Sequence, residues 1–519
     1  MSATSIADIV RNHARQRPDA PALEFEGAAT TFAELDDRSS RLANALAEAG
    51  VRAGDRVAFL DKNTPQFFDL AFALTKIGAV MVAVNWRLAP NEIIQIVDDA
   101  RAPVMFVGSD FFADVEKIES ALGTVSTIVA IGDHERWPGY EEFLGARDAR
   151  DPMVESRGSD VVIQLYTSGT TGLPKGVMIT NDNFFAGLDE IAATWELGPG
   201  AVNLAVMPMF HIAGSGWALF GLAQGCRTVL IREVDAEQIL RAIPEHGVTS
   251  ALFVPAVIQL LITTPGVEDV DFSTLRVITY GASPITETVL TKAMRIFGCK
   301  FVQLYGLTET TGAIVQLEAS DHDPEHRPEL LRSCGRPYPI VELRIVDPET
   351  GEDVAEGEIG ELWTRSGRNM AGYWANDEAT ARAFTDDGWF KTGDAGYRDA
   401  EGYLFLHDRL KDMIVSGGEN VYPAEVENVL AKHPEVADVA VIGVPDEKWG
   451  EAVKAVIVRA AGSSLTGDAL IAFARGELAG YKLPKSVDFA EALPRNPSGK
   501  LLKREIRSPY WEGRERQIG

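Results

Sequence analysis

Short apolar runs alternate with segments of helical periodicity through the first part of the chain. Runs of four or five aliphatic residues are typical of buried strands, and apolar positions three and four apart indicate amphipathic helices. Thr31 and Glu34 fit a capping box at the start of one such helix. This alternation predicts a mostly parallel sheet covered by helices. The predicted strands cover residues 57–60, 80–84, 104–107 and 128–131, and the predicted helices cover residues 6–17, 31–48, 65–77 and 91–100.

Predicted strands and helices continue to alternate beyond residue 200, and the pattern then changes at two places. Residues 341–363 show shorter strands with glycine-containing turns, which indicates a small β-rich subdomain. Pro423 suits the first turn of a helix, and a separate α/β unit follows it. We therefore predict an α/β fold with an N-terminal domain over residues 1–410 and a C-terminal domain over residues 411–519. The further predicted strands are 201–207, 228–231, 251–254, 277–280, 301–304, 439–443, 452–458 and 487–489, with helices at 217–223 and 469–478.

Length and charge narrow the class of protein. A chain of 519 residues is too long for one hydrophobic core. Its formal net charge of −27 argues against nucleic acid and anionic membranes as general partners. The N-terminus carries charges throughout, which argues against a signal peptide, and the longest apolar run, residues 77–84, is too short to span a bilayer. We expect a cytoplasmic enzyme without integral membrane association, and the oligomeric state stays open, a homodimer included.

Residues 161–176 join an apolar strand to a loop rich in glycine and hydroxyl side chains. Glycines let backbone N–H groups approach a bulky anion, hydroxyls add donors and Lys175 adds a positive charge. Such a loop suits a polyphosphate, although it lacks the Walker A spacing. The alternative is a flexible surface hinge, which would need neither the preceding strand nor the lysine. The loop residues are Thr167, Ser168, Gly169, Thr170, Thr171, Gly172, Lys175 and Gly176.

The segment YTSGTTGLPKGV, residues 166–177, resembles the signature loop of the ANL adenylate-forming superfamily. That superfamily includes acyl-CoA synthetases, adenylation domains of peptide synthetases, and luciferases, and its loop holds the β- and γ-phosphates of ATP. The resemblance extends over essentially the whole chain. It implies a large N-terminal domain of covered, mostly parallel sheets and a small, mobile C-terminal lid.

The segment YGLTE, residues 305–309, follows a predicted strand and matches a second motif of the superfamily. A carboxylate at the carboxyl end of a parallel strand faces the ligand crevice, and one or two carboxylates commonly hold Mg²⁺ with ATP. Glu309 is therefore the Mg²⁺ candidate. By resemblance, Thr308 contacts the α-phosphate and Tyr305 stacks on adenine. Without the phosphate loop, an ordinary helix start would be the better interpretation.

Further motifs extend the resemblance toward the C-terminus. Asp394, in WFKTGD, takes the role of the ribose ligand, and Arg409 would contact ribose or phosphate. Lys411 occupies the hinge about which the C-terminal domain swings. Lys500, in a Pro-Ser-Gly loop, corresponds to the lysine that bridges carboxylate, α-phosphate and ribose oxygen, although a surface lysine would look similar. The resemblance assigns ATP contacts to Thr167, Ser168, Gly169, Thr170, Thr171, Gly172, Lys175, Gly281, Ala282, Ser283, Gln303, Tyr305, Gly306, Asp394 and Arg409.

The acyl and thiol sites are assigned by resemblance alone. His211, in PMFHIAG, lines the passage between the acyl pocket and the thiol tunnel. It joins Lys500, Thr308 and Glu309 as a catalytic candidate without an acid–base role, since a lone histidine is usually a packed core residue. Most acyl candidates are small, which suggests an open apolar channel. They are His211, Ala213, Gly214, Gly281, Ala282, Leu304, Gly306 and Gly312, and the CoA candidates are Ser416, Gly417 and Gly418.

These assignments predict an ATP-dependent carboxylic acid–CoA ligase that works through an acyl-adenylate and uses ATP, Mg²⁺ and CoA. The acid would be medium- or long-chain aliphatic, alicyclic or aromatic. An amino-acid substrate is disfavoured because Asp235 lacks the surrounding motif that binds an α-amine. An amide-forming ligase of the same fold is the main alternative, because the adenylation motifs do not separate the two. A non-catalytic nucleotide-binding protein and a luciferase-like oxygenase are the others.

Overall fold

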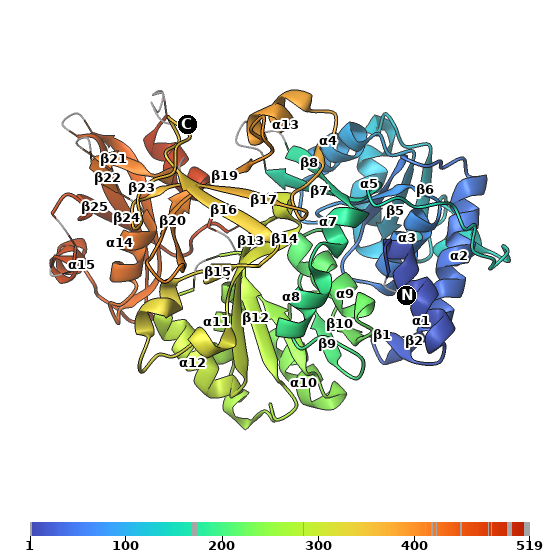
Figure 1. The fold of residues 1–519 in the computed structure, drawn as a ribbon, viewed down its shortest axis with the longest axis horizontal. Helices are drawn as coiled ribbons and strands as arrows, with labels where there is room; N and C mark the ends of the chain where they lie inside the picture. The colour runs from blue at the N-terminus through green and yellow to red at the C-terminus, as the bar shows by residue number, and fades with distance from the viewer. Residues whose placement is uncertain are drawn as a thin grey trace.

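The described residues form four β-sheets with helices packed around them (Figure 1). The coordinates are a computed structural model, which describes residues 3–168, 174–283, 285–409, 412–416, 419–421, 423–446, 449–475, 477–478, 480–495 and 501–512. Three sheets belong to residues up to Arg409, and the fourth begins at Ile414. The predicted domain boundary at residue 410 therefore falls between two sheets, and the division into two domains stays a prediction.

The first sheet has seven strands in the order β18-β8-β7-β4-β3-β5-β6. The strands from β7 to β6 are parallel, whereas β7 pairs with β8 and β8 with β18 in antiparallel fashion. The strands are β3 (Arg56–Leu60), β4 (Val80–Ala83), β5 (Val104–Gly108), β6 (Thr127–Ile131), β7 (Val161–Ser168), β8 (Pro174–Thr180) and β18 (Gly372–Tyr373). The helices of this region are α1 (Ile6–Gln16), α2 (Phe32–Glu48), α3 (Pro65–Lys76), α4 (Pro90–Ala100), α5 (Phe112–Ile118) and α6 (Tyr140–Leu144).

The second sheet has nine strands in the order β15-β14-β13-β12-β11-β9-β10-β1-β2. Its central strands from β13 to β1 are parallel, and its two ends are antiparallel. The strands are β1 (Pro21–Phe25), β2 (Ala28–Thr31), β9 (Val202–Ala205), β10 (Arg227–Leu230), β11 (Ser250–Phe253), β12 (Val277–Gly281), β13 (Lys300–Leu307), β14 (Gly312–Leu317) and β15 (Arg336–Pro337). The helices here are α7 (Asn181–Phe185), α8 (Leu188–Thr194), α9 (Ile212–Ala223), α10 (Ala236–His246), α11 (Pro255–Thr263) and α12 (Glu287–Phe297).

The third and fourth sheets are smaller. The third is an antiparallel sheet of β16 (Val341–Val346), β17 (Gly360–Ser366), β19 (Phe390–Arg398) and β20 (Leu404–Arg409), with α13 (Asp377–Ala383) between β18 and β19. The fourth contains β21 (Ile414–Ser416), β22 (Glu419–Val421), β23 (Val436–Asp446), β24 (Gly450–Arg459) and β25 (Ser486–Ala490). Its helices are α14 (Pro423–Leu430), α15 (Gly467–Ala474) and α16 (Lys503–Arg507), and Figure 1 shows this unit at the left.

The fold class is confirmed, with small differences at the element ends. Thr31 accepts from the Glu34 backbone and Glu34 accepts from the Thr31 backbone, so the predicted capping box is present. The helix predicted at 217–223 begins earlier, at Ile212, because glycines within an apolar segment hid its first turn. The helix predicted at 469–478 ends at Ala474. Strands β1, β2, β8, β14, β15 and β18 are among those that the pattern did not predict, because short strands carry little periodicity.

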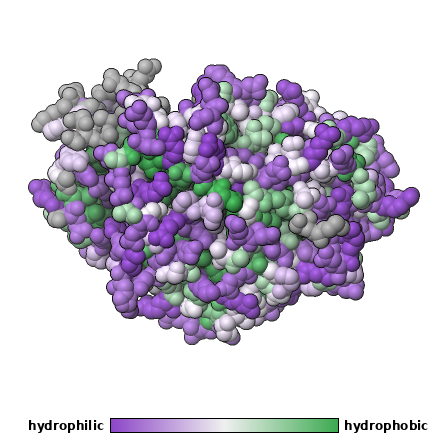
Figure 2. Space-filling view, in the orientation of Figure 1, coloured by the Kyte–Doolittle hydropathy of each residue, from purple (hydrophilic) through white to green (hydrophobic). Residues whose placement is uncertain are grey.

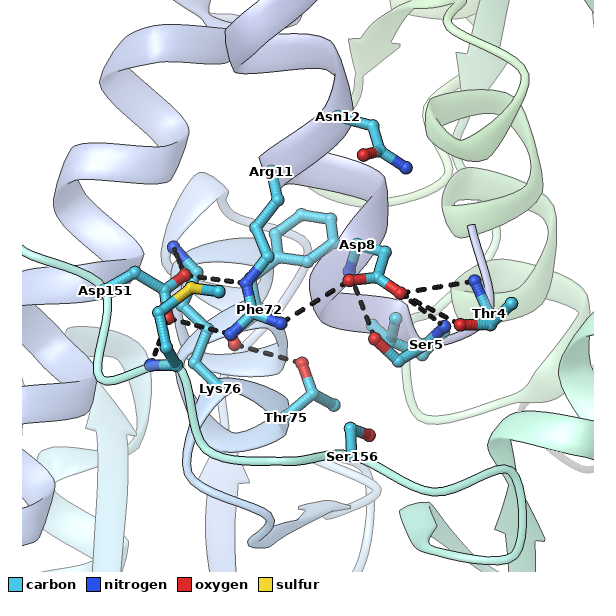
Figure 3. A network of polar contacts seen from close by, with 12 residues as sticks. Thr4, Ser5, Asp8, Arg11, Asn12, Phe72, Thr75, Lys76, Asp151 and Ser156 are labelled. Carbon is cyan, nitrogen blue, oxygen red and sulfur yellow. Dashed lines mark hydrogen bonds and ion pairs between the residues drawn. The ribbon is translucent and has the colours of Figure 1, made fainter. Parts of the chain in front are cut away.

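A network of polar side chains fastens the connection before β7 to the N-terminal helices (Figure 3). Arg11 of α1 forms two hydrogen bonds to the Asp151 carboxylate, at 2.8 and 2.7 Å. Lys76 of α3 is fully buried and donates to Asp36 and to Ser39 and Ser40. Its ammonium also lies 3.5 Å from Asp151. The charge is thus surrounded by oxygens, and the connection that enters the phosphate-loop strand is held from two helices.

Hydrophilic residues cover most of the face shown in Figure 2. Among the described residues, six large hydrophobic side chains are exposed: Met153, Val154, Leu260, Trp449, Phe473 and Tyr481. None of the helices in the described part of the chain has the length and apolar character needed to cross a bilayer.

Candidate active site

The end of β7 and the turn after β13 bring two predicted motifs together. Thr167, the residue before the last of β7, donates from Oγ1 to Oε1 of Glu309 at 3.3 Å. The two strands belong to different sheets, so the contact lies where the first and second sheets meet. Residues 169–173, which include the predicted ligands Gly169, Thr170, Thr171 and Gly172, lie outside the described residues, as does the side chain of Ser168.

The turn that carries Thr308 and Glu309 is fixed by close backbone packing. A Cβ on Gly306 would lie 1.9 Å from the carbonyl oxygen of Gly312, so only glycine fits there. Thr310 Oγ1 accepts from the Leu307 backbone at 2.9 Å and donates to the Gly312 carbonyl at 2.7 Å. Thr311 adopts a φ of +50° and donates to the Arg368 carbonyl. These contacts place Glu309 at the end of β13 facing the phosphate-loop strand.

The oxygen donors at this point suit a magnesium ion. Mg²⁺ prefers hard oxygen ligands and is usually held by one or two carboxylates together with phosphate oxygens and water. Oε1 of Glu309 accepts from Thr167 and also from Tyr373, at 3.1 Å, whereas within the described part of the chain Oε2 has no hydrogen-bond partner. The residues present therefore fit a magnesium ion that is shared with the phosphates of a nucleotide.

The predicted adenine and ribose residues are also adjacent. Tyr305 of β13 donates from its hydroxyl to Oδ2 of Asp394 at 2.9 Å, and both side chains are buried. Burial and the neighbouring carboxylate together raise the pKa of Tyr305, so its hydroxyl stays protonated. Asp394 lies on β19 opposite Arg409 of β20, whose side chain lies outside the described residues. The carboxylate of Asp394, the predicted ribose ligand, therefore contacts the tyrosine of the YGLTE motif.

The segment that carries His211 is attached to both large sheets. Asn63, which follows β3, is buried, and its Nδ2 lies within 3.2 Å of the carbonyl oxygens of Val206, Met207 and Ile231. Its Oδ1 accepts from the Met209 backbone at 3.1 Å. The end of β3 thereby holds the chain between β9 and α9. Nothing in the sequence indicated this role, because Asn63 belongs to none of the motifs.

His211 is neutral and incompletely bonded. Its Nε2 is buried without a hydrogen-bond partner among the described residues. Burial, and to a lesser extent the charge of Arg87, lower the pKa of His211 to about 4. The ring packs against Phe210, with 4.5 Å between ring centroids. A neutral, buried imidazole is consistent with a residue that lines the passage between the acyl pocket and the thiol tunnel. That role of His211 stays a prediction.

The small residues of the predicted acyl pocket have another physical explanation. A Cβ on Gly214 would lie 2.2 Å from the Pro208 carbonyl oxygen, and a Cβ on Gly281 would lie 2.2 Å from that of Leu304. Together with Gly306, these glycines allow backbone segments to pack closely, so their small size is no evidence for an open channel. Ala213 and Leu304 pack against the core, Ala282 is exposed with a φ of +66°, and Gly312 has a φ of +85°.

Several other candidates have structural contacts or lie outside the described residues. Gln303 is buried, with its Oε1 3.3 Å from the Tyr280 hydroxyl oxygen, and Ser283 is half-buried beside β12. Ser416 is buried at the end of β21, where it pairs with Gly450. Asp235, rejected above as an amine ligand, caps α10 through the Gln238 backbone. The predicted residues Lys411, Gly417, Gly418 and Lys500 lie outside the described residues.

Two side chains near the site were missed because they lie outside the recognised motifs. Tyr373 contacts Glu309, as described above. Arg368 is fully buried and donates to the carbonyl oxygens of Thr311 and Ala186 at 2.6 and 2.9 Å. Burial lowers the pKa of Arg368 to about 10, so the guanidinium stays charged near neutral pH. An arginine in a strand-rich segment is ordinarily a surface residue, which is why the sequence did not indicate it.

The comparisons with known proteins agree with this arrangement. The profile described as AMP-binding enzyme matches residues 10–374, and the one described as AMP-binding enzyme C-terminal domain matches residues 425–500. The chain is 40% identical over 513 residues to a fatty acid–[acyl-carrier-protein] ligase of Streptomyces coeruleorubidus, covering 98% of this chain and 96% of that protein. It is also 40% identical over 498 residues to a feruloyl-CoA synthase of an Amycolatopsis species, covering 96% and 97%.

A solved structure agrees over the same length. The amide bond synthetase McbA from Marinactinospora thermotolerans superimposes with a TM-score of 0.87 at 30% sequence identity, covering 97% of this chain and 100% of that one. Family profiles that span most of the chain, and relatives aligned from end to end, identify the protein as an enzyme of the AMP-binding family within the ANL adenylate-forming superfamily.

Proposed function

We propose that the protein is an ATP-dependent carboxylic acid–CoA ligase that works through an acyl-adenylate. The observation that carries this proposal is the junction between the two large sheets. There the strand of the phosphate loop meets Glu309, and on β13 Tyr305 meets Asp394 of the third sheet. Glu309 with Thr167 lies where the polyphosphate of a magnesium nucleotide would bind, and Asp394 lies where its carboxylate would accept hydrogen bonds from both ribose hydroxyls. The phosphate and nucleoside halves of ATP therefore each have a candidate partner.

The first half-reaction forms the adenylate. The carboxylate oxygen attacks the α-phosphorus, a P–O bond forms, and the bond to the β-phosphate oxygen breaks to release pyrophosphate. When bound, Mg²⁺ would neutralise phosphate charge. Lys175 and the loop hydroxyls would hold the β- and γ-phosphates, Thr308 the α-phosphate, and Lys500 would stabilise the crowded anionic transition state. The carboxylate of Glu309 would orient the metal, and Asp394 with Arg409 would fix the ribose.

The second half-reaction transfers the acyl group to a thiol. A thiolate attacks the acyl carbon, the bond to the phosphate oxygen breaks, and AMP leaves. A C-terminal lid, residues 411–519, would turn about Lys411 to bring the Ser416–Gly418 segment to the thiol in place of Lys500. Such a rotation would let one crevice serve both steps. His211 would line the passage between the acyl group and the thiol.

The acceptor is proposed to be the thiol of CoA, in a cytoplasmic enzyme. The feruloyl-CoA synthase relative supports this choice, and the acyl-carrier-protein ligase relative points to the same nucleophile on a protein. An amide-forming ligase is the second candidate, favoured by the similarity to the amide bond synthetase. The acid is proposed to be medium- or long-chain aliphatic, alicyclic or aromatic. The neutral, buried imidazole of His211 adds no charge that would bind a second carboxylate or an amine.

The test is pyrophosphate release across a panel of carboxylic acids, measured with Mg²⁺-ATP and with no acceptor, CoA, a phosphopantetheinylated carrier protein, or free amines. We expect acid-dependent release that CoA accelerates, with an acyl-CoA product identified by mass spectrometry. An amide product with no thioester would replace this proposal by the second candidate. Failure of every acid to give an adenylate would reject both.

A further inference from the structure

A short segment after β17 connects Glu309 to the strand that leaves the phosphate loop. The Met370 backbone N–H donates to the Glu309 carbonyl oxygen at 2.8 Å. The Ala371 and Trp374 N–H groups donate to Met178 and Gly176 of β8, at 3.0 and 2.8 Å. Within this segment, β18 pairs with β8 as an edge strand. The backbone of residues 370–374 thus bridges the two motifs that would hold the nucleotide.

The side chain of Tyr373 joins the same two motifs. Its hydroxyl donates to Oε1 of Glu309 at 3.1 Å, and Lys175 Nζ lies over its ring, 4.9 Å from the centroid. The side chain is held in place, because the residue is 9% exposed and its backbone N–H donates to Thr380 Oγ1 at 2.9 Å. One tyrosine therefore contacts both the proposed metal carboxylate and the proposed phosphate lysine.

Two neighbouring side-chain hydroxyls donate hydrogen bonds to the same oxygen of the Glu309 carboxylate. Thr167 and Tyr373 both donate to Oε1, which fixes the plane of the carboxylate. The other oxygen, Oε2, is without a partner in the described ranges and stays available to a cation. A carboxylate that is already oriented loses less side-chain freedom when it binds a metal, and such supporting hydrogen bonds commonly change metal affinity by about 10- to 100-fold.

We propose that Tyr373 is a positioning residue for magnesium-nucleotide binding: its hydroxyl orients the Glu309 carboxylate toward the metal, and its ring aligns Lys175 with the phosphates. This inference rests on the proposed function. The simpler explanation is that Tyr373 only packs the edge of the first sheet. The two explanations differ in what loss of the Tyr373 hydroxyl would change. If Tyr373 only packs the sheet edge, the loss would lower stability and leave metal affinity unchanged.

The experiment measures metal affinity without turnover. Mn²⁺ replaces Mg²⁺ as a paramagnetic probe, and α,β-methylene ATP replaces ATP because its α–β bridge cannot be cleaved. Electron paramagnetic resonance then reports free Mn²⁺ as the full-length enzyme is titrated at saturating analogue. For Tyr373→Phe, which keeps the ring over Lys175, we expect affinity for Mn²⁺ about 10-fold weaker than that of the unchanged protein.

Tyr140→Phe is the matched control, because Tyr140 is also buried and donates from its hydroxyl to a carboxylate, that of Asp69, at 2.9 Å. It lies on α6, outside the site. We expect this variant to unfold at a lower temperature and to bind Mn²⁺ normally. Unchanged affinity in Tyr373→Phe, or an equal loss in both variants, overturns the positioning role.

A second variant separates the hydroxyl from the backbone of the segment. Thr380→Ala removes the acceptor for the Tyr373 backbone and leaves the Tyr373 side chain intact. We expect it to retain Mn²⁺ affinity, and a loss equal to that of Tyr373→Phe would attribute the effect to packing. If the unchanged protein itself does not bind Mn²⁺ with the ATP analogue, the proposed function fails before the role of Tyr373 is tested.

Discussion

Single buried polar residues around the site make hydrogen bonds that the motifs do not reveal. Arg368 holds the carbonyl of Thr311, Tyr373 orients Glu309, and Tyr305 bonds to Asp394. In each case a side chain reaches a partner far along the chain. Motif spacing identified Glu309, Tyr305 and Asp394 because they lie in short recognisable segments. It gave no indication of Arg368 or Tyr373, whose importance depends only on which atoms they meet.

At the residue scale, the surroundings of His322 predict how the stability of the protein depends on pH. Its Nδ1 faces the Glu318 carbonyl oxygen at 2.8 Å, so Nδ1 carries the proton and Nε2 accepts from the Tyr280 hydroxyl at 3.0 Å. Burial lowers the pKa of His322 to about 4, against an ordinary value of 6.5 for histidine. The unfolded chain therefore takes up a proton between about pH 6.5 and pH 4 that the folded protein does not. Its contribution to stability is complete above pH 6.5 and is lost as the pH falls toward 4.

As the pH falls across that interval, we expect proton uptake by His322 in the unfolded chain to lower the free energy of unfolding by up to about 3 kcal/mol. Urea unfolding at several pH values, compared between the unchanged protein and His322→Gln, measures the difference. The variant should be less stable at pH 7.5 and show a shallower decline on acidification. Parallel pH profiles for the two proteins would contradict the assignment, since other titrating groups are common to both.

At the scale of elements, the ends of strands from different sheets meet and are joined by side-chain amides. Asn63 after β3 contacts the ends of β9 and β10 and the backbone of Met209. The parallel order of each sheet brings these strand ends to one edge, where the segments that carry His211 and Glu309 begin. The hydrophobic pattern predicted most of these strands. It did not predict β14, which lies inside the second sheet between β13 and β15, or the edge strand β18, which depends on pairing with β8, far away in the sequence.

Asn63→Ala tests this junction. Removal of the amide leaves buried carbonyl oxygens unpaired, and we expect a loss of about 2–3 kcal/mol in the free energy of unfolding. We also expect the KM for the carboxylic acid to rise more than the KM for ATP, because the freed segment leads to His211.

Asn44→Ala is the control, since its amide also donates to two backbone carbonyls but lies at the surface. The free energy of unfolding of this variant should fall by less than about 1 kcal/mol, because water can replace the two lost hydrogen bonds. Equal losses in the two variants would contradict a role for burial at Asn63.

At the scale of the whole molecule, the proposed reaction needs two distant segments to act on one nucleotide in turn. The fourth sheet forms a unit after β20, and the residues that would enter the site from it are Lys500 and Gly418. If they alternate, their substitutions should separate the two half-reactions. Lys500→Ala should reduce pyrophosphate exchange by about 10²- to 10³-fold and leave thioester formation from supplied acyl-adenylate largely intact.

Gly418→Leu should give the reverse pattern, because a side chain would obstruct a thiol that passes the backbone. Isotope exchange between pyrophosphate and ATP measures the first half-reaction, and acyl-CoA formation from synthetic acyl-adenylate measures the second. Loss of both halves in both variants would contradict an alternating lid.

The fold class, most parallel strands and the adenylate-forming motifs could be predicted from the sequence, because periodicity and short motifs are local properties of the chain. Thr31 with Glu34, and the strand before Thr167, are examples. The folded chain was needed to show that Thr167, Glu309 and Tyr373 meet, and that Gly214, Gly281 and Gly306 are small because backbone fills the space beside them. Those facts depend on which surfaces pack together in three dimensions, and the local pattern of residues does not record that packing.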